Sequence, residues 1–183
     1  MTIICCGDSN TFGYDPRSFL GDRYDASCRW VDILAEEIGW NIHNDSMNGR
    51  EIPRQKISFS KSADLLILML GTNDLLQGAT AEETAKRMED FLGNLSRDDP
   101  KILLLAPPPL NRGEWVTEDS LIRESRILSG LYRRLAEEKR TLFADTGEWN
   151  IPLAFDGVHM TEEGNKIFAQ NLVTYLKKHL CGD

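Results

Sequence analysis

One serine stands directly after a short apolar run close to the start of the chain, in the sequence Gly7-Asp8-Ser9-Asn10. A run of this kind is typical of a buried strand, so the serine is expected at the mouth of a sheet, where Gly7 permits a sharp turn. A serine hydroxyl attacks a carbonyl only poorly until a base accepts its proton. Ser9 is therefore a candidate nucleophile, with capping of the following helix as its alternative role.

The chain has three histidines, and His159 lies in an irregular loop three residues after Asp156, with Gly157 between them. An imidazole with a pKa of about 6.5 is a suitable general base near neutral pH. At this spacing the Asp156 carboxylate can accept the Nδ1 proton, which leaves Nε2 of His159 facing outward as the base. His43 falls in a predicted strand and His179 in the tail of the last predicted helix, so we expect structural or solvent-facing roles for both.

Neutral hydrogen-bond donors follow the second and third predicted strands. Gly49 closes the loop Asn44–Gly49, and Asn73 lies in the loop that starts at Gly71. The tetrahedral intermediate of acyl transfer needs preorganised donors around its oxyanion. The candidates are the N–H groups of Ser9 and Gly49 and the side-chain amide of Asn73, and the absence of a Cβ lets the glycine backbone approach a ligand closely.

The elements that must position these residues alternate between short apolar runs and segments of helical period. Apolar runs predict buried strands at 3–6, 65–70 and 102–106, with weaker strand candidates at 40–44 and 141–144. Periodicity predicts helices at 30–38 before Gly39, from Thr80 with a capping box to Glu83, across 121–135, and from about 161. The alternation predicts one α/β domain over residues 1–183, with a helix between successive parallel strands and helices on both faces of the sheet. Ligands of such sheets bind beyond the carboxyl ends of the strands, where the candidate residues are expected.

Composition argues against several classes of function. The 183 residues carry 21 Lys and Arg against 29 Asp and Glu, a net charge of −8, so no nucleic-acid partner is expected. The longest apolar run, 65–70, is far too short for a membrane span. The start lacks the basic and apolar pattern of a secretory leader, which favours a cytoplasmic location. The four cysteines have no C-x-x-C spacing, so reduced thiols and no metal site are expected: Cys5, Cys6, Cys28 and Cys181.

Two other functions remain open for the first loop. Its hydroxyl groups are similar to the phosphate loop of flavodoxins, which would make the chain a flavin-binding module. Two aspartates that follow apolar runs could instead belong to a magnesium-dependent receiver domain. A flavodoxin gives the aspartate–histidine pair no role, and a receiver needs a lysine after its fifth strand, where residues 144–146 read Ala-Asp-Thr. The residues concerned are Ser9, Thr11 and Gly13 for phosphate, and Asp8 and Asp74 for magnesium.

The four loops together resemble the sequence blocks of the SGNH (GDSL) hydrolase family. Gly7-Asp8-Ser9, Gly71-Thr72-Asn73-Asp74 and Asp156-Gly157-Val158-His159 are close to the family pattern, and Gly49 is retained in a looser second block. The resemblance covers nearly the whole chain, and segments 6–14, 29–30 and 106–109 are similar to the arylesterase and perhydrolase branch. It implies a three-layer α/β/α, flavodoxin-like fold with a five-stranded parallel sheet and no cofactor.

The resemblance also implies a serine esterase or acylhydrolase that cleaves a small-molecule carboxylic ester through an acyl-enzyme on Ser9. His159 would be the base and Asp156 its orienter, with Ser9, Gly49 and Asn73 as oxyanion donors. A carbohydrate O-acetylesterase, a thioesterase or a lysophospholipase are alternatives on the same site, and a homo-oligomer is left open. No lid insertion is evident, so short acyl chains are favoured. The hydrophobic candidates for substrate contact are Phe12, Tyr14, Met47, Trp115, Trp149 and Phe155.

Overall fold

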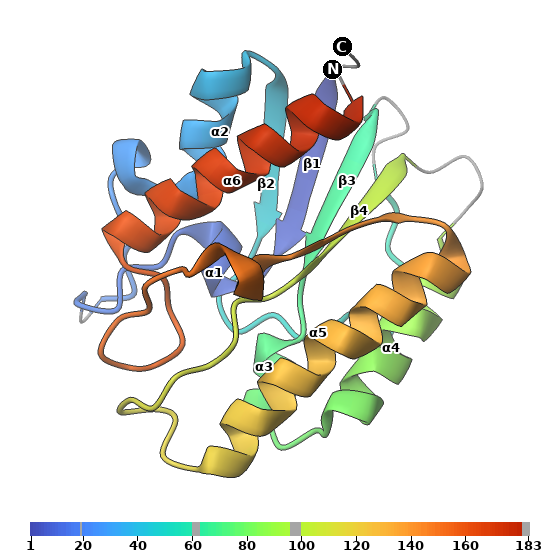
Figure 1. The fold of residues 1–183 in the computed structure, drawn as a ribbon. Helices are drawn as coiled ribbons and strands as arrows, with labels where there is room; N and C mark the ends of the chain where they lie inside the picture. The colour runs from blue at the N-terminus through green and yellow to red at the C-terminus, as the bar shows by residue number, and fades with distance from the viewer. Residues whose placement is uncertain (19, 60–62, 96–99, 181–183) are drawn as a thin grey trace.

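Within residues 1–18, 20–59, 63–95 and 100–180, which the computed structural model describes, five strands form one sheet in the order β2-β1-β3-β4-β5 (Figure 1). The strands are β1 Thr2–Gly7, β2 Asn41–Ser46, β3 Leu65–Met69, β4 Lys101–Ala106 and β5 Leu142–Asp145. Each neighbouring pair is parallel. The carboxyl ends of the strands therefore meet at one edge of the sheet.

The strands lie where the apolar runs predict them. Strand β3 is buried along its whole length, as expected for a strand with helices on both of its faces. Strand β2 lies at the edge of the sheet, pairs with β1 and is mostly exposed. Its exposure explains why its apolar signal in the sequence is weaker.

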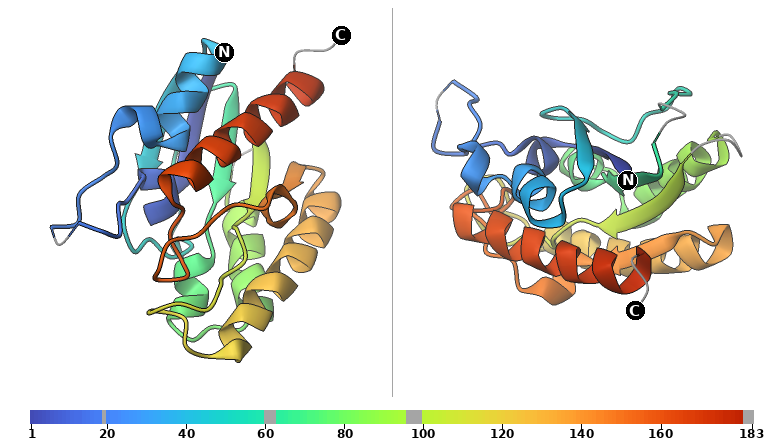
Figure 2. Two further views of the ribbon diagram at one scale, coloured as in Figure 1. Left: turned by 60° about the vertical axis from the view of Figure 1, so that its left-hand side comes forward. Right: turned by 90° about the horizontal axis from the view of Figure 1, so that it is seen from above.

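Helices cover both faces of the sheet and complete three layers (Figures 1 and 2). On one face, Trp30 and Phe168 pack with the strand residue Ile67, and on the other face Tyr132 packs with the adjacent Leu68. The first face is covered by α2 and α6 and the second by α4 and α5. The elements are α1 Ser9–Phe12, η1 Ala26–Cys28, α2 Trp30–Ile38, α3 Thr72–Leu76, α4 Ala81–Gly93, α5 Asp119–Lys139, η2 Thr146–Trp149 and α6 Glu162–Leu180.

Two predicted helix boundaries are confirmed by the structure. Helix α2 ends at Gly39, whose φ of 68° lies in the left-handed region that favours glycine. Helix α4 begins after Thr80, and the Thr80 and Glu83 side chains each bond the other's backbone in a capping box. These local signals fix where the chain turns back toward the sheet.

The connection between β2 and β3 is not the helix that the alternation predicts. Its described residues, 47–59 and 63–64, contain no helix. Ile52 and Phe59 are buried in the core on the α4 and α5 side of the sheet. The Ile52 N–H donates to the Asp74 carboxylate, and Pro53 has no N–H to contribute to a helical ladder. A side chain of α3 thus holds one backbone N–H of this link.

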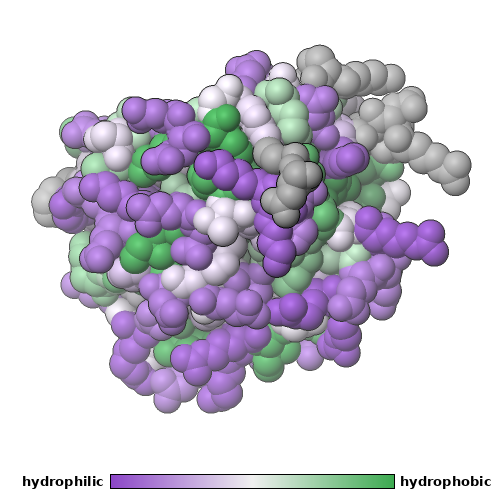
Figure 3. Space-filling model, turned by 45° about the horizontal axis from the view of Figure 1, so that its top comes forward, coloured by the Kyte–Doolittle hydropathy of each residue, from purple (hydrophilic) through white to green (hydrophobic). Residues whose placement is uncertain are grey.

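Among the described helices, none joins the length and the apolar composition that crossing a membrane requires. Even α5, with 21 residues, carries exposed charges such as Arg126 and Arg134. Figure 3 shows a face of the molecule that is mostly hydrophilic, with small scattered hydrophobic patches. The apolar residues are concentrated instead in the two cores beside the sheet.

Candidate active site

Ser9 is the first residue of α1, and Asp8 alone separates it from the end of the inner strand β1. Asp8, and not Ser9, caps this helix, because its carboxylate accepts the Asn10 N–H at 3.0 Å. The alternative role of Ser9 as a cap is therefore not supported. In a sheet of this strand order, β1 and β3 flank the point where the chain changes direction, and ligands of such folds bind there.

Ser9, His159 and Asp156 form a continuous chain of contacts. Ser9 Oγ lies 2.9 Å from His159 Nε2, and His159 Nδ1 lies 2.6 Å from Asp156 Oδ2. With its proton on Nδ1, the ring donates to Asp156 and accepts the Ser9 hydroxyl proton. The three residues are 6%, 3% and 0% exposed, so little water competes for these bonds.

The Asp156 carboxylate is held in its charged form by the groups around it. Burial by itself would raise the pKa of Asp156, but the bond from the His159 ring opposes it. The N–H groups of His159 and Val158 also donate to Oδ1, at 3.0 and 2.9 Å. Together these bonds hold the pKa below its usual range. Asp156 is thus ionised when His159 has to become positive.

Asn10 ties the histidine loop to the serine helix, and the sequence analysis did not single it out. Its side-chain Nδ2 donates to the Val158 carbonyl at 3.1 Å, and its Oδ1 accepts the Met160 N–H at 2.9 Å. These two backbone groups flank His159 on either side. The Trp30 indole donates to the Asn10 carbonyl at 2.9 Å, so Asn10 is itself bonded to a side chain of the core. Its position beside Ser9 is the only signal in the sequence that could have drawn attention to it.

The predicted oxyanion donors lie beside Ser9. Gly49, with φ of 72°, sits in a turn that is closed by the Arg50 N–H donating to the Met47 carbonyl at 3.2 Å. Asn73 Nδ2 donates to the Arg50 carbonyl at 3.2 Å, which leaves its second amide hydrogen available. Ser9, Gly49 and Asn73 all line one cavity.

This cavity has a volume of about 250 Å³ and opens around the serine. Two aromatic rings enclose the base: the Tyr14 ring centroid lies 4.6 Å and the Trp115 centroid 5.2 Å from that of His159. Asn48 and Leu76 also contribute to the wall, and the sequence analysis missed both. Asn48 precedes Gly49 and Leu76 follows Asn73 by one helical turn, so proximity to those two residues was the available signal. The lining residues are Ser9, Tyr14, Asn48, Gly49, Asn73, Leu76, Trp115 and His159.

Four of the six predicted substrate contacts lie outside this lining. Trp149 packs edge-on against Phe168 at 5.1 Å, within the core between the sheet and α6. The Phe12 ring is covered by the Arg23 guanidinium at 4.5 Å. Met47 and Phe155 are half exposed but line no part of the cavity. Tyr14 and Trp115 are the two candidates that line the cavity.

Trp115 reaches the cavity because its loop is bonded to the histidine loop. The Trp115 N–H donates to the Asp156 carbonyl at 3.1 Å, and the Glu114 N–H donates to the Phe155 carbonyl at 3.0 Å. Gly113 makes this approach possible, since a Cβ there would lie 2.4 Å from the backbone of Asp156 and Gly157. The two loops thus form one wall.

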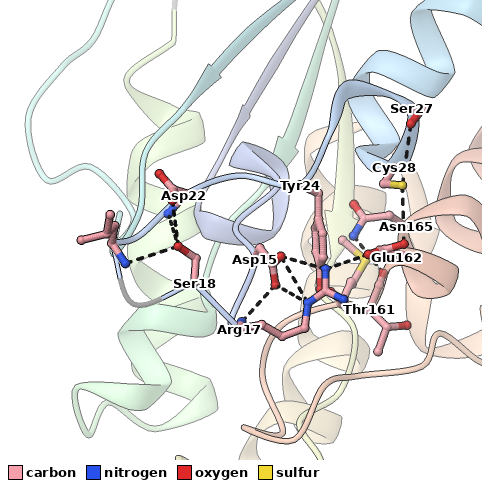
Figure 4. A network of polar contacts seen from close by, with 12 residues as sticks. Asp15, Arg17, Ser18, Asp22, Tyr24, Ser27, Cys28, Thr161, Glu162 and Asn165 are labelled. Carbon is pink, nitrogen blue, oxygen red and sulfur yellow. Dashed lines mark hydrogen bonds and ion pairs between the residues drawn. The ribbon is translucent and has the colours of Figure 1, made fainter.

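Tyr14 belongs to a segment that ion pairs connect to α6. Figure 4 shows Arg17 between Asp15 and Glu162, at 2.8 and 2.7 Å. The Tyr24 hydroxyl donates to the Met160 carbonyl at 3.3 Å. These contacts join Arg17 and Tyr24 to the chain directly after the histidine.

Within 1–18, 20–59, 63–95 and 100–180, no group of three or more His, Cys, Asp or Glu residues is arranged to hold a metal ion. The Asp74 carboxylate is occupied by the Arg87 guanidinium and the Ile52 N–H. Cys5, Cys6 and Cys28 are free thiols, and Cys181 lies outside the described residues. The site therefore presents a serine, a histidine and an aspartate together with amide donors.

The fold and these contacts define a class: α/β proteins of flavodoxin-like topology with a Ser–His–Asp hydrogen-bond chain at the switch point of the sheet. The model of the GDSL-like lipase/acylhydrolase family matches residues 5–167, and the chain belongs to this family. It is accordingly a hydrolase that acts on ester bonds, and a flavin-binding module is not favoured.

Solved structures of esterases share this fold over nearly the whole chain. The native aryl esterase of M. smegmatis matches with a TM-score of 0.85 at 23% identity, over 98% of this chain and 99% of that chain. The carbohydrate acetylesterase Est24 of Sinorhizobium meliloti matches with a TM-score of 0.81 at 25% identity, over 97% and 98%. A member of the lipolytic G-D-S-L family from Veillonella parvula matches with a TM-score of 0.77 at 21% identity, over 100% of both chains. A search of the curated proteins gave no match.

Proposed function

We propose that this enzyme hydrolyses small carboxylic esters through an acyl-enzyme on Ser9. His159 accepts the hydroxyl proton as Oγ attacks the ester carbonyl, and Asp156 stabilises the imidazolium that forms. The oxyanion is held by the N–H groups of Ser9 and Gly49 and by the Asn73 amide. The alcohol leaves with the proton from His159, and water then cleaves the acyl-enzyme by the reverse steps.

The observation that carries this proposal is the buried Ser9–His159–Asp156 chain, with its contacts of 2.9 and 2.6 Å. Ser9 and His159 are 150 positions apart in the sequence, so only the fold brings them together. A serine that merely filled space at the end of a strand would not need a buried imidazole aligned on a buried carboxylate. The amide donors beside the same hydroxyl supply the oxyanion-binding groups that an acyl-transfer site also requires.

Removal of either reacting side chain tests the assignment. Ser9→Ala and His159→Ala should each lower kcat on nitrophenyl acetate by at least about 10³-fold while circular dichroism stays native, because triad members act as a unit. Ser27→Ala and His179→Ala are matched controls, since both residues are exposed and lie outside the cavity. Near wild-type turnover by Ser9→Ala would show that the nucleophile is another residue.

A covalent label gives an independent check of the nucleophile. A fluorophosphonate should form one adduct, and peptide mass spectrometry should locate it on Ser9. His159→Ala should react far more slowly with the same reagent, because the hydroxyl then has no base. An adduct on any other serine contradicts the mechanism.

The small cavity supports esters with short acyl chains as substrates. A sugar acetate is a second candidate, and two observations favour it: the carbohydrate acetylesterase Est24 shares the fold at 25% identity, and the polar Asn48 lies in the cavity wall. Release of acetate from acetylated oligosaccharides, compared with nitrophenyl acetate, distinguishes the two. We also propose one domain over residues 1–183 and a cytoplasmic location, which the free thiols of Cys5, Cys6 and Cys28 support.

A further inference from the structure

Two consecutive side chains of α3 form hydrogen bonds with the segment that carries Gly49. Asn73 donates to the Arg50 carbonyl at 3.2 Å, and the next residue, Asp74, accepts the Ile52 N–H at 3.0 Å. The Asp74 side chain is fully buried, and Ile52 is 1% exposed. The distance between the Gly49 N–H and the Asn73 amide is therefore fixed by how α3 holds residues 50–52.

Arg87 of α4 contacts both α3 and the segment bonded to it. Its Nη1 lies 2.9 Å from Asp74 Oδ1 in α3 and 3.7 Å from Glu51 Oε2, which belongs to residues 50–52. The Arg87 side chain is 29% exposed, and its partner Asp74 is not exposed at all. A buried carboxylate needs such a partner, because the remaining backbone N–H alone leaves its charge poorly compensated.

We infer that Arg87 is a positioning residue that sets the Gly49 N–H and the Asn73 amide relative to each other, and this inference rests on the proposed function. Oxyanion donors act only within a narrow range of distances from the developing charge. Without Arg87, the buried Asp74 carboxylate loses its ion-pair partner and can shift toward solvent, which loosens its hold on Ile52. Arg87 does not line the cavity and touches no reacting atom, so its effect reaches the reaction through the donors alone.

The inference predicts a loss in kcat with little change in KM, because the donors bind the transition state more strongly than the substrate. Arg87→Met should lower kcat on nitrophenyl acetate by about 10- to 100-fold, the size of effect that a displacement of about 1 Å produces. Arg87→Lys, which retains a positive charge, should recover part of that loss. Lys86→Met is the matched control: it is the preceding residue of α4, 63% exposed and paired with Glu89 and Asp90.

A double-mutant cycle separates positioning from a general effect on the fold. Asn73→Ala alone should cost about 10²- to 10³-fold in kcat. In that background, Arg87→Met should cost less than about threefold, because one of the donors that Arg87 positions is already gone. An equal loss in both backgrounds, or an unchanged kcat in Arg87→Met, overturns the inference.

Two measurements keep this test decisive. Thermal melting of every variant identifies those that are folded at the assay temperature, and if Arg87→Met is not, Arg87→Lys and Arg87→Gln carry the same comparison. Ser9→Ala distinguishes a failure of the proposed function from a failure of the positioning role alone. If it keeps its activity, the proposed function and this inference both fail, whereas a dead Ser9→Ala with full activity in Arg87→Met defeats the positioning role only.

Discussion

Asp8 and Asp156 are both buried carboxylates near Ser9, yet their surroundings shift their pKa values in opposite directions. Burial raises the pKa of Asp8 to about 6, although the hydrogen bond from the Asn10 N–H opposes the shift. The pKa of Asp156 is lowered, because hydrogen bonds from His159 and the backbone outweigh its burial. Asp156 therefore remains charged through the pH range in which Asp8 titrates.

The raised pKa of Asp8 makes the stability of the fold depend on pH. Between the ordinary aspartate value of 3.8 and about 6, the folded protein binds more protons at Asp8 than the unfolded chain does, so stability falls as pH rises. Asp8→Asn can still accept the Asn10 N–H but does not ionise. Its free energy of unfolding relative to wild type should therefore increase by up to about 3 kcal/mol between pH 4 and pH 7.

Urea unfolding of both proteins at several pH values measures this difference. The exposed Asp25, whose side chain makes no capping bond, provides the control substitution Asp25→Asn. A pH-independent difference for Asp8→Asn would show that Asp8 does not titrate in this window.

The sequence allowed prediction of the candidate site residues that lie in recognisable motifs. It did not allow prediction of those whose contacts are made only in the folded chain. Ser9 and His159 each stand in a loop with a suggestive composition, and the structure brings them within hydrogen-bond distance. Asn10 contacts residues nearly 150 positions away, which no local pattern reveals. Leu76 is an apolar residue in a helix, a pattern that is typical of the core. Its place in the cavity wall depends on how α3 is oriented.

At the scale of elements, the strands and long helices could be predicted because each is fixed by a local pattern. Buried runs, the Thr80 capping box and Gly39 marked their positions, and the structure confirms them. The link between β2 and β3 could not be predicted. Two of its hydrogen bonds are made with Asn73 and Asp74, so its conformation depends in part on an element that follows it in the chain.

The wall that joins the Trp115 loop to the histidine loop makes one glycine critical. In Gly113→Ala the new Cβ meets backbone atoms at 2.4 Å, and backbone cannot move aside as a flexible side chain can. We expect a fall in kcat of about tenfold or more, because the base loop is displaced. Gly130→Ala is the control, since a Cβ in the middle of α5 meets nothing within 4 Å. It should stabilise the protein by about 0.5–1 kcal/mol.

Enzyme kinetics and melting temperatures of the two alanine variants test this expectation together. If Gly113→Ala retains full kcat and stability, the two loops are not held as closely as the structure indicates.

At the scale of the whole molecule, loops from across the sheet enclose a cavity of about 250 Å³, below the roughly 300–1,000 Å³ of sites for drug-sized ligands. On nitrophenyl esters from acetyl to dodecanoyl, kcat/KM should be highest for the shortest chains and fall by at least about tenfold at the longest. Leu76→Ala should move the maximum to longer chains by removing part of the wall. Leu131→Ala, outside the cavity, should leave the profile unchanged. A maximum at dodecanoyl in the wild type would contradict the short-chain proposal.

The hydroxyl of Ser9 and the ring of His159 are 150 positions apart, and α6 follows the ring. In the proposed mechanism, a nascent chain that has left the ribosome only in part already carries the Ser9 hydroxyl but lacks the His159 base. Turnover must therefore begin late, after the final elements have docked. During refolding from urea, the onset of ester cleavage should mark the time at which the last elements have docked. Spectroscopic signals of the earlier collapse should precede this onset.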